Sequence, residues 1–163
     1  MKGFLYIILA VLFLSVLVIP VVEVFMLGRD RILLASALYN SFRAARESGY
    51  SYQKMREIDA VADEEAFLRS FADTFAASYG MDCIDPTANP LHFTCPDRTF
   101  NDFEVHIDFM EETRDGGAIA TVVTITAKTE YRFRTAYLQA LDSGGGAPYL
   151  LQKTQSHTMR VTN

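Results

Sequence analysis

FLYIILAVLFLSVLVIPVV, residues 4–22, is a run of 19 residues without a charge in a chain of 163 residues. Ser15 and Pro20 are its only breaks, and apolar residues resume after Glu23 and continue to Leu27. A helix needs about 20 apolar residues to cross the hydrocarbon core of a bilayer. The run therefore predicts a retained membrane anchor. The alternative is a cleavable signal peptide, whose apolar region is usually about 7–15 residues long and ends at a small-x-small site.

The helical pattern continues beyond the apolar run. Its apolar positions are Ile32, Leu33, Leu34, Ala37, Leu38, Phe42 and Ala45. The first plausible break is Gly49, so one helix is predicted from about residue 3 to residue 48, a length of roughly 70 Å. Its first half is apolar all round and must lie in lipid or in a bundle. Its second half has one apolar stripe, which suits packing against a head domain.

Charges near the membrane leave two questions open. The basic residues Arg29, Arg31, Arg43 and Arg46 follow the apolar run, and the positive-inside rule would place that side in the cytoplasm. The cysteines and the β-rich remainder favour an exported head, which is our prediction. Glu23 is either an interfacial carboxylate in water or a buried charge that pairs with a basic group of a neighbouring subunit.

Residues 51–163 are predicted to form this head, after an anchor and stalk segment at residues 1–50. A helix is expected over 64–79, with Asp63 as its N-cap and Gly80 as its stop, and a shorter helical piece over 55–61. Strands are expected over 103–109, 119–127 and 150–161, with Tyr131 and Phe133 as an extension of the second. Residues 113–117 suit a hairpin turn, and 81–98 and 142–146 suit loops. The predicted fold class is α+β, with an antiparallel sheet packed on helices.

Two cysteines, Cys83 and Cys95, lie in the predicted loop. They are expected to form one disulfide, which would close a loop of about a dozen residues and contribute about 2–4 kcal/mol. Their spacing matches no zinc pattern. Asp82 and Asp85 flank Cys83, but a solvated loop is a better interpretation than a calcium site.

The remaining composition favours no catalytic or nucleic-acid function. A net charge of −5 and scattered basic residues argue against a nucleic-acid binder. His92, His106 and His157 are far apart in the sequence, and the last two are expected at polar strand positions. The glycines at 144–146 are not followed by the Lys-Ser/Thr pair of a phosphate-binding loop. We therefore expect a protein that is not an enzyme and has no cofactor or metal.

Two short motifs resemble TadE-like pseudopilins of the type IV pilin class. Ile19-Pro20-Val21-Val22-Glu23-Val24-Phe25 is similar to the family's apolar segment that ends in Glu-Phe, and residues 42–49, FRAARESG, are similar to its Ala-Ala-Arg-x-Gly region. A β-rich C-terminal part that ends near Met159-Arg160 is also similar. The wider class is cleaved after a glycine, which suggests a leader that ends between Gly3 and Phe4. A glutamate stands five residues into the mature helix of that class, whereas Ile8 stands there in this chain.

The resemblance implies a pilin-like structural subunit of an extracellular filament or secretion assembly, with a part in cell adhesion. Its partners would be other copies of itself or related subunits, together with the membrane, and its head would be exported. Apolar helices would bundle in the filament core. The expected contacts are Leu5, Ile8, Leu12, Val16, Ile19 and Glu23. The alternative is a single-pass, membrane-anchored binding or scaffold module that does not polymerise.

Overall fold

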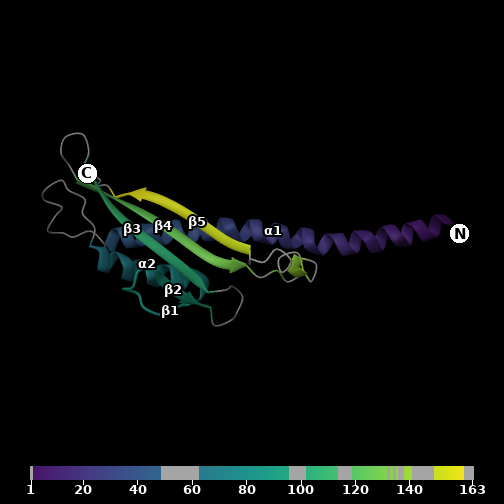
Figure 1. The fold of residues 1–163 in the computed structure, drawn as a ribbon, viewed down its shortest axis with the longest axis horizontal. Coiled ribbons are helices and arrows are strands. Elements are labelled where there is room, and N and C mark those ends of the chain that lie inside the picture. Colours follow the sequence, from purple (N-terminus) through teal and green to yellow (C-terminus); the bar gives the residue numbers. More distant parts are fainter. Residues whose placement is uncertain are drawn as a thin grey trace.

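The structure is a computed structural model, and it describes residues 2–48, 63–95, 102–113, 119–131, 133, 135, 138–140 and 149–159. A long N-terminal helix, α1, is followed by a second helix, α2, and by a five-stranded antiparallel sheet (Figure 1). This arrangement confirms the predicted α+β class, with a long apolar helix and a small head.

Helix α1 runs from Lys2 to Ser48, as the sequence predicts. Its N-terminal part projects away from the rest of the molecule (Figure 1). Its second half is amphipathic, and one face enters the head. The buried apolar residues of this face are Leu27, Leu34, Ala37, Leu38, Phe42 and Ala45. The head is therefore built from both chain segments, because residues 27–45 of the stalk supply part of its core.

Helix α2, Glu64–Tyr79, has the two ends that the sequence predicts. The side chain of Asp63 accepts a hydrogen bond from the Ala66 amide at 3.1 Å and so caps the first turn. Gly80 adopts a left-handed conformation, with φ of 63°, and ends the helix. Its apolar stripe is buried and consists of Phe67, Leu68, Phe71, Ala72 and Phe75.

The sheet follows the order of the chain, β1-β2-β3-β4-β5, with every neighbouring pair antiparallel. The strands are β1 (Asp82–Cys83), β2 (Leu91–Thr94), β3 (Phe103–Thr113), β4 (Ile119–Tyr131) and β5 (Tyr149–Thr158). The alternation predicted for the first long strand is confirmed, because Phe103, Val105 and Ile107 are buried while the residues between them are exposed. Such alternation is typical of a sheet with one covered face.

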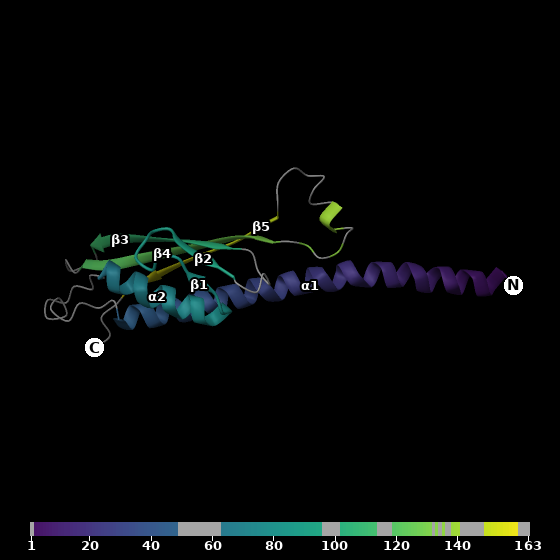
Figure 2. The same ribbon diagram turned by 90° about the horizontal axis from the view of Figure 1, so that it is seen from below.

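Both helices cover one face of the sheet and leave the other open (Figure 2). Helix α2 packs with its phenylalanines against the strands. The ring of Phe75 lies 4.9 Å from that of Phe93 and 5.9 Å from that of Phe103 between centroids, and Phe67 meets Phe109 edge-on at 5.4 Å. Helix α1 contributes Phe42, whose ring lies 6.0 Å from that of Phe67. The core is therefore a layer of aromatic rings between two helices and a sheet.

Some predictions differ from the structure, and others lie outside the described residues. The segment 81–98, which was expected to be a loop, contains the short strands β1 and β2. The two strands are short, and Pro86 and Pro90 fall in the connection between them, so no alternation long enough to recognise is present. The second long strand ends at Tyr131, before Phe133, and the last strand ends at Thr158. The predicted short helix at 55–61, most of the turn at 113–117 and the loop at 142–146 are not among the described residues.

Candidate functional site

The projecting part of α1 is the largest exposed apolar surface of the described residues. From Gly3 to Val22 the helix carries large hydrophobic side chains in every direction, and the predicted contacts Ile8, Leu12, Val16 and Ile19 are 43–72% exposed. Twenty residues of helix extend about 30 Å, the thickness of the hydrocarbon core of a bilayer. By length and composition, α1 is therefore able to cross a membrane.

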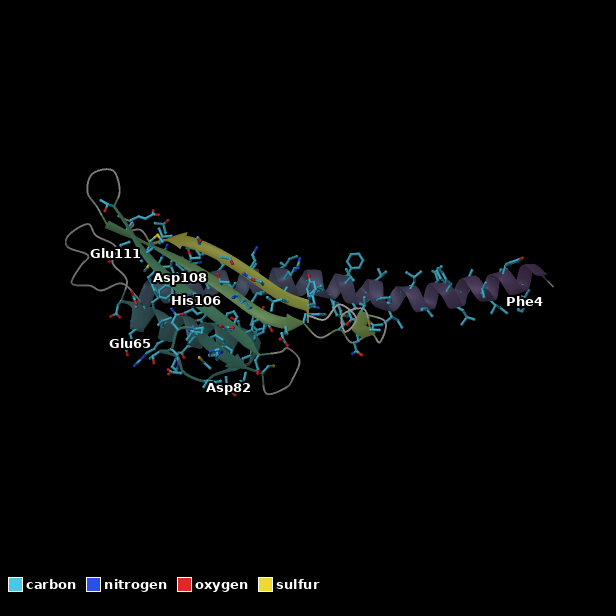
Figure 3. All side chains as sticks on the ribbon, in the orientation of Figure 1. Phe4, Glu65, Asp82, His106, Asp108 and Glu111 are labelled. Atoms are coloured by element: carbon cyan, nitrogen blue, oxygen red, sulfur yellow. The ribbon has the colours of Figure 1, made fainter. Side chains whose placement is uncertain are left out.

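The N-terminal positions of this surface are only partly described. Phe4 is 71% exposed and lies near the tip of the projecting helix (Figure 3). A side chain at Gly3 would meet no other atom within 4 Å, so this glycine is not required by packing within the chain. The side chain of Leu5 lies outside the described part of the structure. Cleavage between Gly3 and Phe4 stays a prediction.

Glu23 marks the junction between the exposed apolar helix and the head. It is only 6% exposed, in contrast to the apolar residues on either side of it. One carboxylate oxygen accepts hydrogen bonds from the Thr135 backbone amide, at 3.0 Å, and from the Thr135 hydroxyl. The Thr135 carbonyl in turn accepts from the Gln139 amide at 2.9 Å. Glu23 therefore anchors the connection between β4 and β5 to α1. A contact of Glu23 with a neighbouring subunit stays a prediction, but the carboxylate already has partners in its own chain.

A groove of about 800 Å³ lies where α1 passes the edge strand β5. Two cations, Arg31 of α1 and Lys153 of β5, line it, and no carboxylate stands among its described lining residues. The Arg31 guanidinium donates to the Tyr149 hydroxyl and lies over its ring, and the Gln155 amide donates to the Ala35 carbonyl at 3.0 Å. Helix and strand are thus connected by two hydrogen bonds. We call this feature, defined by Arg31 and Lys153, the basic groove.

His157 also lines the basic groove, and its environment differs from the polar strand position that we predicted. Its register opposite Val123 places it on the helix-facing side of the sheet. There its ring stacks on Phe42, with 4.3 Å between centroids and 20° between planes. Burial lowers the pKa of His157. It therefore acts as an aromatic packing residue that favours the neutral form.

The opposite side of the head, around α2 and β1–β3, is rich in carboxylates. Glu65, Asp82, Asp108 and Glu111 are exposed there, as is His106, whose Nε2 lies 3.0 Å from Asp108 (Figure 3). Among the described residues, no group of three or more His, Cys, Asp or Glu side chains is arranged to hold a metal ion. Glu65 is paired with Arg69 at 2.6 Å, and His106 and Asp108 lie on the open face of β3, so these carboxylates do not form one site.

The two aspartates next to Cys83 are solvated. Asp85 accepts hydrogen bonds from the Thr87 amide at 2.9 Å and from its hydroxyl at 2.7 Å. These hydrogen bonds lower the pKa of Asp85 and stabilise the connection between β1 and β2. Asp82 is exposed on β1. The solvated interpretation of these aspartates suits their surroundings.

The two cysteines lie on neighbouring strands at the same end of the sheet. Cys83 is opposite Phe93 in the ladder, and Cys95 lies two residues beyond Phe93, so the two side chains share a face and are diagonal neighbours. Both are partly buried free thiols that pack against the core. Burial raises the pKa of Cys83. The Cys83–Cys95 disulfide stays a prediction.

Comparison with known proteins adds no assignment. No family model, no curated protein and no solved structure matches this chain. The class that the structure itself defines is a single long apolar helix that carries a small α+β head.

Two features were missed at the sequence level. Thr135 lies 112 residues from Glu23 in the sequence, and no local pattern announces that the two meet. The basic groove depends on the register of β5 against β4, which places Lys153 on the helix-facing side. The available signal was Lys153, a charged residue between Leu151 and Gln155 in a predicted strand. A lysine in such a place is typical of an edge strand, where its charge prevents pairing with another sheet.

Proposed function

We propose that the chain is a pilin-like structural subunit, which assembles with other copies through the apolar half of α1 and displays its head outside the membrane. The observation that carries the proposal is the projecting helix. Its described side chains are exposed in every direction over about 20 residues, so the surface needs a cover that the described part of the chain does not provide. A bundle of equivalent helices offers such a cover, as does lipid.

The continuity of α1 supports assembly beyond simple anchoring. An anchor needs only the membrane-spanning segment, whereas α1 continues for a further 26 residues from Glu23 to Ser48 as part of the same helix. The head packs on this second half through Leu34, Leu38 and Phe42. Such a helix holds each head at a fixed rotation and height relative to its apolar segment, which a regular assembly requires.

A second candidate function is a membrane-anchored scaffold that does not polymerise. The observation that favours it is the match between the exposed helix, about 30 Å from Gly3 to Val22, and the hydrocarbon thickness of a bilayer. Lipid alone is therefore able to cover the whole apolar surface.

Electron microscopy of the purified full-length chain separates the two functions. Regular filaments after removal of detergent are the expected result, and particles that stay monomeric at every detergent concentration would favour the scaffold. Leu12→Arg places a charge in the middle of the exposed helix and is expected to abolish filaments. Phe25→Arg, beside Glu23 at the end of this segment, is the matched control because a long cation there reaches water. Normal filament yield from Leu12→Arg would contradict packing through this helix.

A further inference from the structure

Two pairs of like-charged residues lie on opposite sides of the head. The sheet has β1 at one edge and β5 at the other, and α2 packs beside β1 while α1 packs beside β5. Four strand spacings of about 4.8 Å separate the edges by roughly 19 Å. The basic groove lies on the β5 side. Asp73 of α2 and Asp82 of β1, both exposed, lie on the other side, and we call this pair the acidic edge.

The two cations and the two carboxylates lie at similar heights along α1. On the groove side, Arg31 bonds to Tyr149 at the start of β5, and Lys153 lies between this contact and that of Gln155 with Ala35. The basic groove therefore covers the level of α1 from Arg31 to Asn40, with its two cations in the lower part of this range.

Tyr79, the last residue of α2, shows the height of the acidic edge along α1. The ring of Tyr79 lies 5.5 Å from that of Phe103 between centroids, and Phe103 is in register with Thr129 of β4 and, through it, with Leu151 of β5. The end of α2 is therefore level with the start of β5, where the groove begins. Asp82 follows three residues later, and Asp73 precedes Tyr79 by six residues, or about 9 Å of helix. Both sides thus present opposite charges within the same band of about 10 Å above the apolar segment.

Copies that share one membrane also share their orientation. Their apolar segments occupy the same layer, so their heads stand parallel and meet at equal heights. When parallel copies touch through different sides, the contact is heterologous, and it repeats from copy to copy. A basic groove on one side and carboxylates at the same height on the other satisfy this condition. Like sides, in contrast, would bring equal charges together.

We propose that the basic groove of one copy receives the acidic edge of a second, parallel copy, with Arg31 and Lys153 facing Asp73 and Asp82. This inference rests on the proposed function, since it needs copies that stand side by side. It adds which side of one head meets which side of the next, because packing of the apolar helices alone does not define this. Exposed ion pairs are individually weak and screened by salt. The contact therefore orders neighbouring heads, while the apolar helices supply most of the association.

Two charge-reversed variants of the full-length chain test the contact. The groove-reversed variant carries Arg31→Glu and Lys153→Glu, and the edge-reversed variant carries Asp73→Lys and Asp82→Lys. Each variant alone brings like charges together at every contact. In an equal mixture, each variant finds the other complementary on both of its sides. Lys128→Glu, on the open face of β4, is the matched control for a change of charge.

The measurement is fluorescence energy transfer between two labelled populations in vesicles of neutral phosphatidylcholine, at fixed protein-to-lipid ratio and low salt. We expect the association constant of each variant alone to fall at least about tenfold, which corresponds to ~1.4 kcal/mol. The equal mixture is expected to recover association to near the wild-type value, and Lys128→Glu to leave it unchanged. Thermal unfolding of each variant checks that the head remains folded. Recovery of association in the mixture is independent evidence that both variants are folded.

Several results would overturn the inference. Wild-type association by each variant alone would show that the two sides do not meet, as would a mixture that recovers nothing. An effect of the groove-reversed variant that appears only with anionic lipid, without any effect of the edge-reversed variant, would assign the groove to the membrane surface. Filaments from a chain whose mixture shows no recovery would leave the proposed function standing and remove only this contact. Absence of both filaments and energy transfer in the wild type would remove both.

Discussion

The contact between Glu23 and Thr135 predicts a local, measurable loss of stability on substitution. Glu23→Ala removes a nearly buried carboxylate that accepts two hydrogen bonds from Thr135. A hydrogen bond to a charged acceptor contributes about 1.5–3 kcal/mol, and an amide left without an acceptor loses a similar amount. Opening of the segment around Thr135 is therefore expected to become roughly 10- to 150-fold more favourable. Glu23→Gln keeps an acceptor oxygen but loses the charge, so its effect is expected to be smaller.

Hydrogen–deuterium exchange of the full-length chain in detergent micelles, read by mass spectrometry, measures this opening. Peptides that contain Thr135 are expected to exchange faster in Glu23→Ala by the factor given above. Peptides from β3 and the centre of β4 serve as the internal control, because Ile107 and Ile125 lie in the core away from Glu23. Thr135→Val, which keeps the backbone donor and removes only the hydroxyl, is the matched variant and is expected to give a partial effect.

Two outcomes would refute the reasoning. Unchanged exchange at Thr135 in Glu23→Ala would show that the carboxylate does not hold the segment, and would return Glu23 to the role of an intersubunit contact. Faster exchange that spreads equally over β3 and β4 would show that Glu23 supports the whole head, which contradicts the local role inferred from its position.

Three further predictions follow from the head. Phe71→Ala, in the fully buried stripe of α2, is expected to lower the free energy of unfolding by about 3–5 kcal/mol in chemical denaturation; a loss below about 1 kcal/mol would contradict tight packing there. Because burial lowers the pKa of His157, the unfolded chain binds protons more readily, so the melting temperature should fall as the pH drops through the pKa of an unfolded histidine. His157→Phe is expected to weaken this pH dependence, whereas His106→Gln, at an exposed position, is expected to retain it. Equal pH profiles of the melting temperature for the wild type and both variants would refute the role of His157. Mass spectrometry of exported, unreduced protein is expected to show Cys83 linked to Cys95, and free thiols in that material would count against the disulfide.

The parts of the fold that could be predicted from the sequence are those whose hydrophobic pattern extends over many consecutive residues. The apolar run is recognisable by its length alone. The stripe of α2 between Asp63 and Gly80 and the alternation of β3 each repeat over at least seven residues, so their buried faces are recognisable without knowledge of the partner. Strands β1 and β2 escape this rule. The first has two residues and the second has four, and both are defined by pairing with neighbours and not by their own pattern.

The site features depend even more on tertiary register. His157 lies in a strand of polar residues, yet the pairing of β5 with Val123 turns its ring toward Phe42. Glu23 is an isolated charge in an apolar helix, which is a recognisable signal for a partner. Its partner, however, lies in the connection between β4 and β5, where no periodic pattern exists.

Because α1 is one continuous helix, a tilt of its apolar segment also displaces the head. From Glu23 to Ser48 the helix rises about 39 Å above the apolar segment, and helices in bilayers tilt by about 20° on average. A tilt of that size would carry the far end of the head sideways by about 13 Å, several times the reach of a hydrogen bond. Neighbouring copies that differ in tilt by this amount would therefore separate their heads, whereas copies that tilt together would keep them in contact.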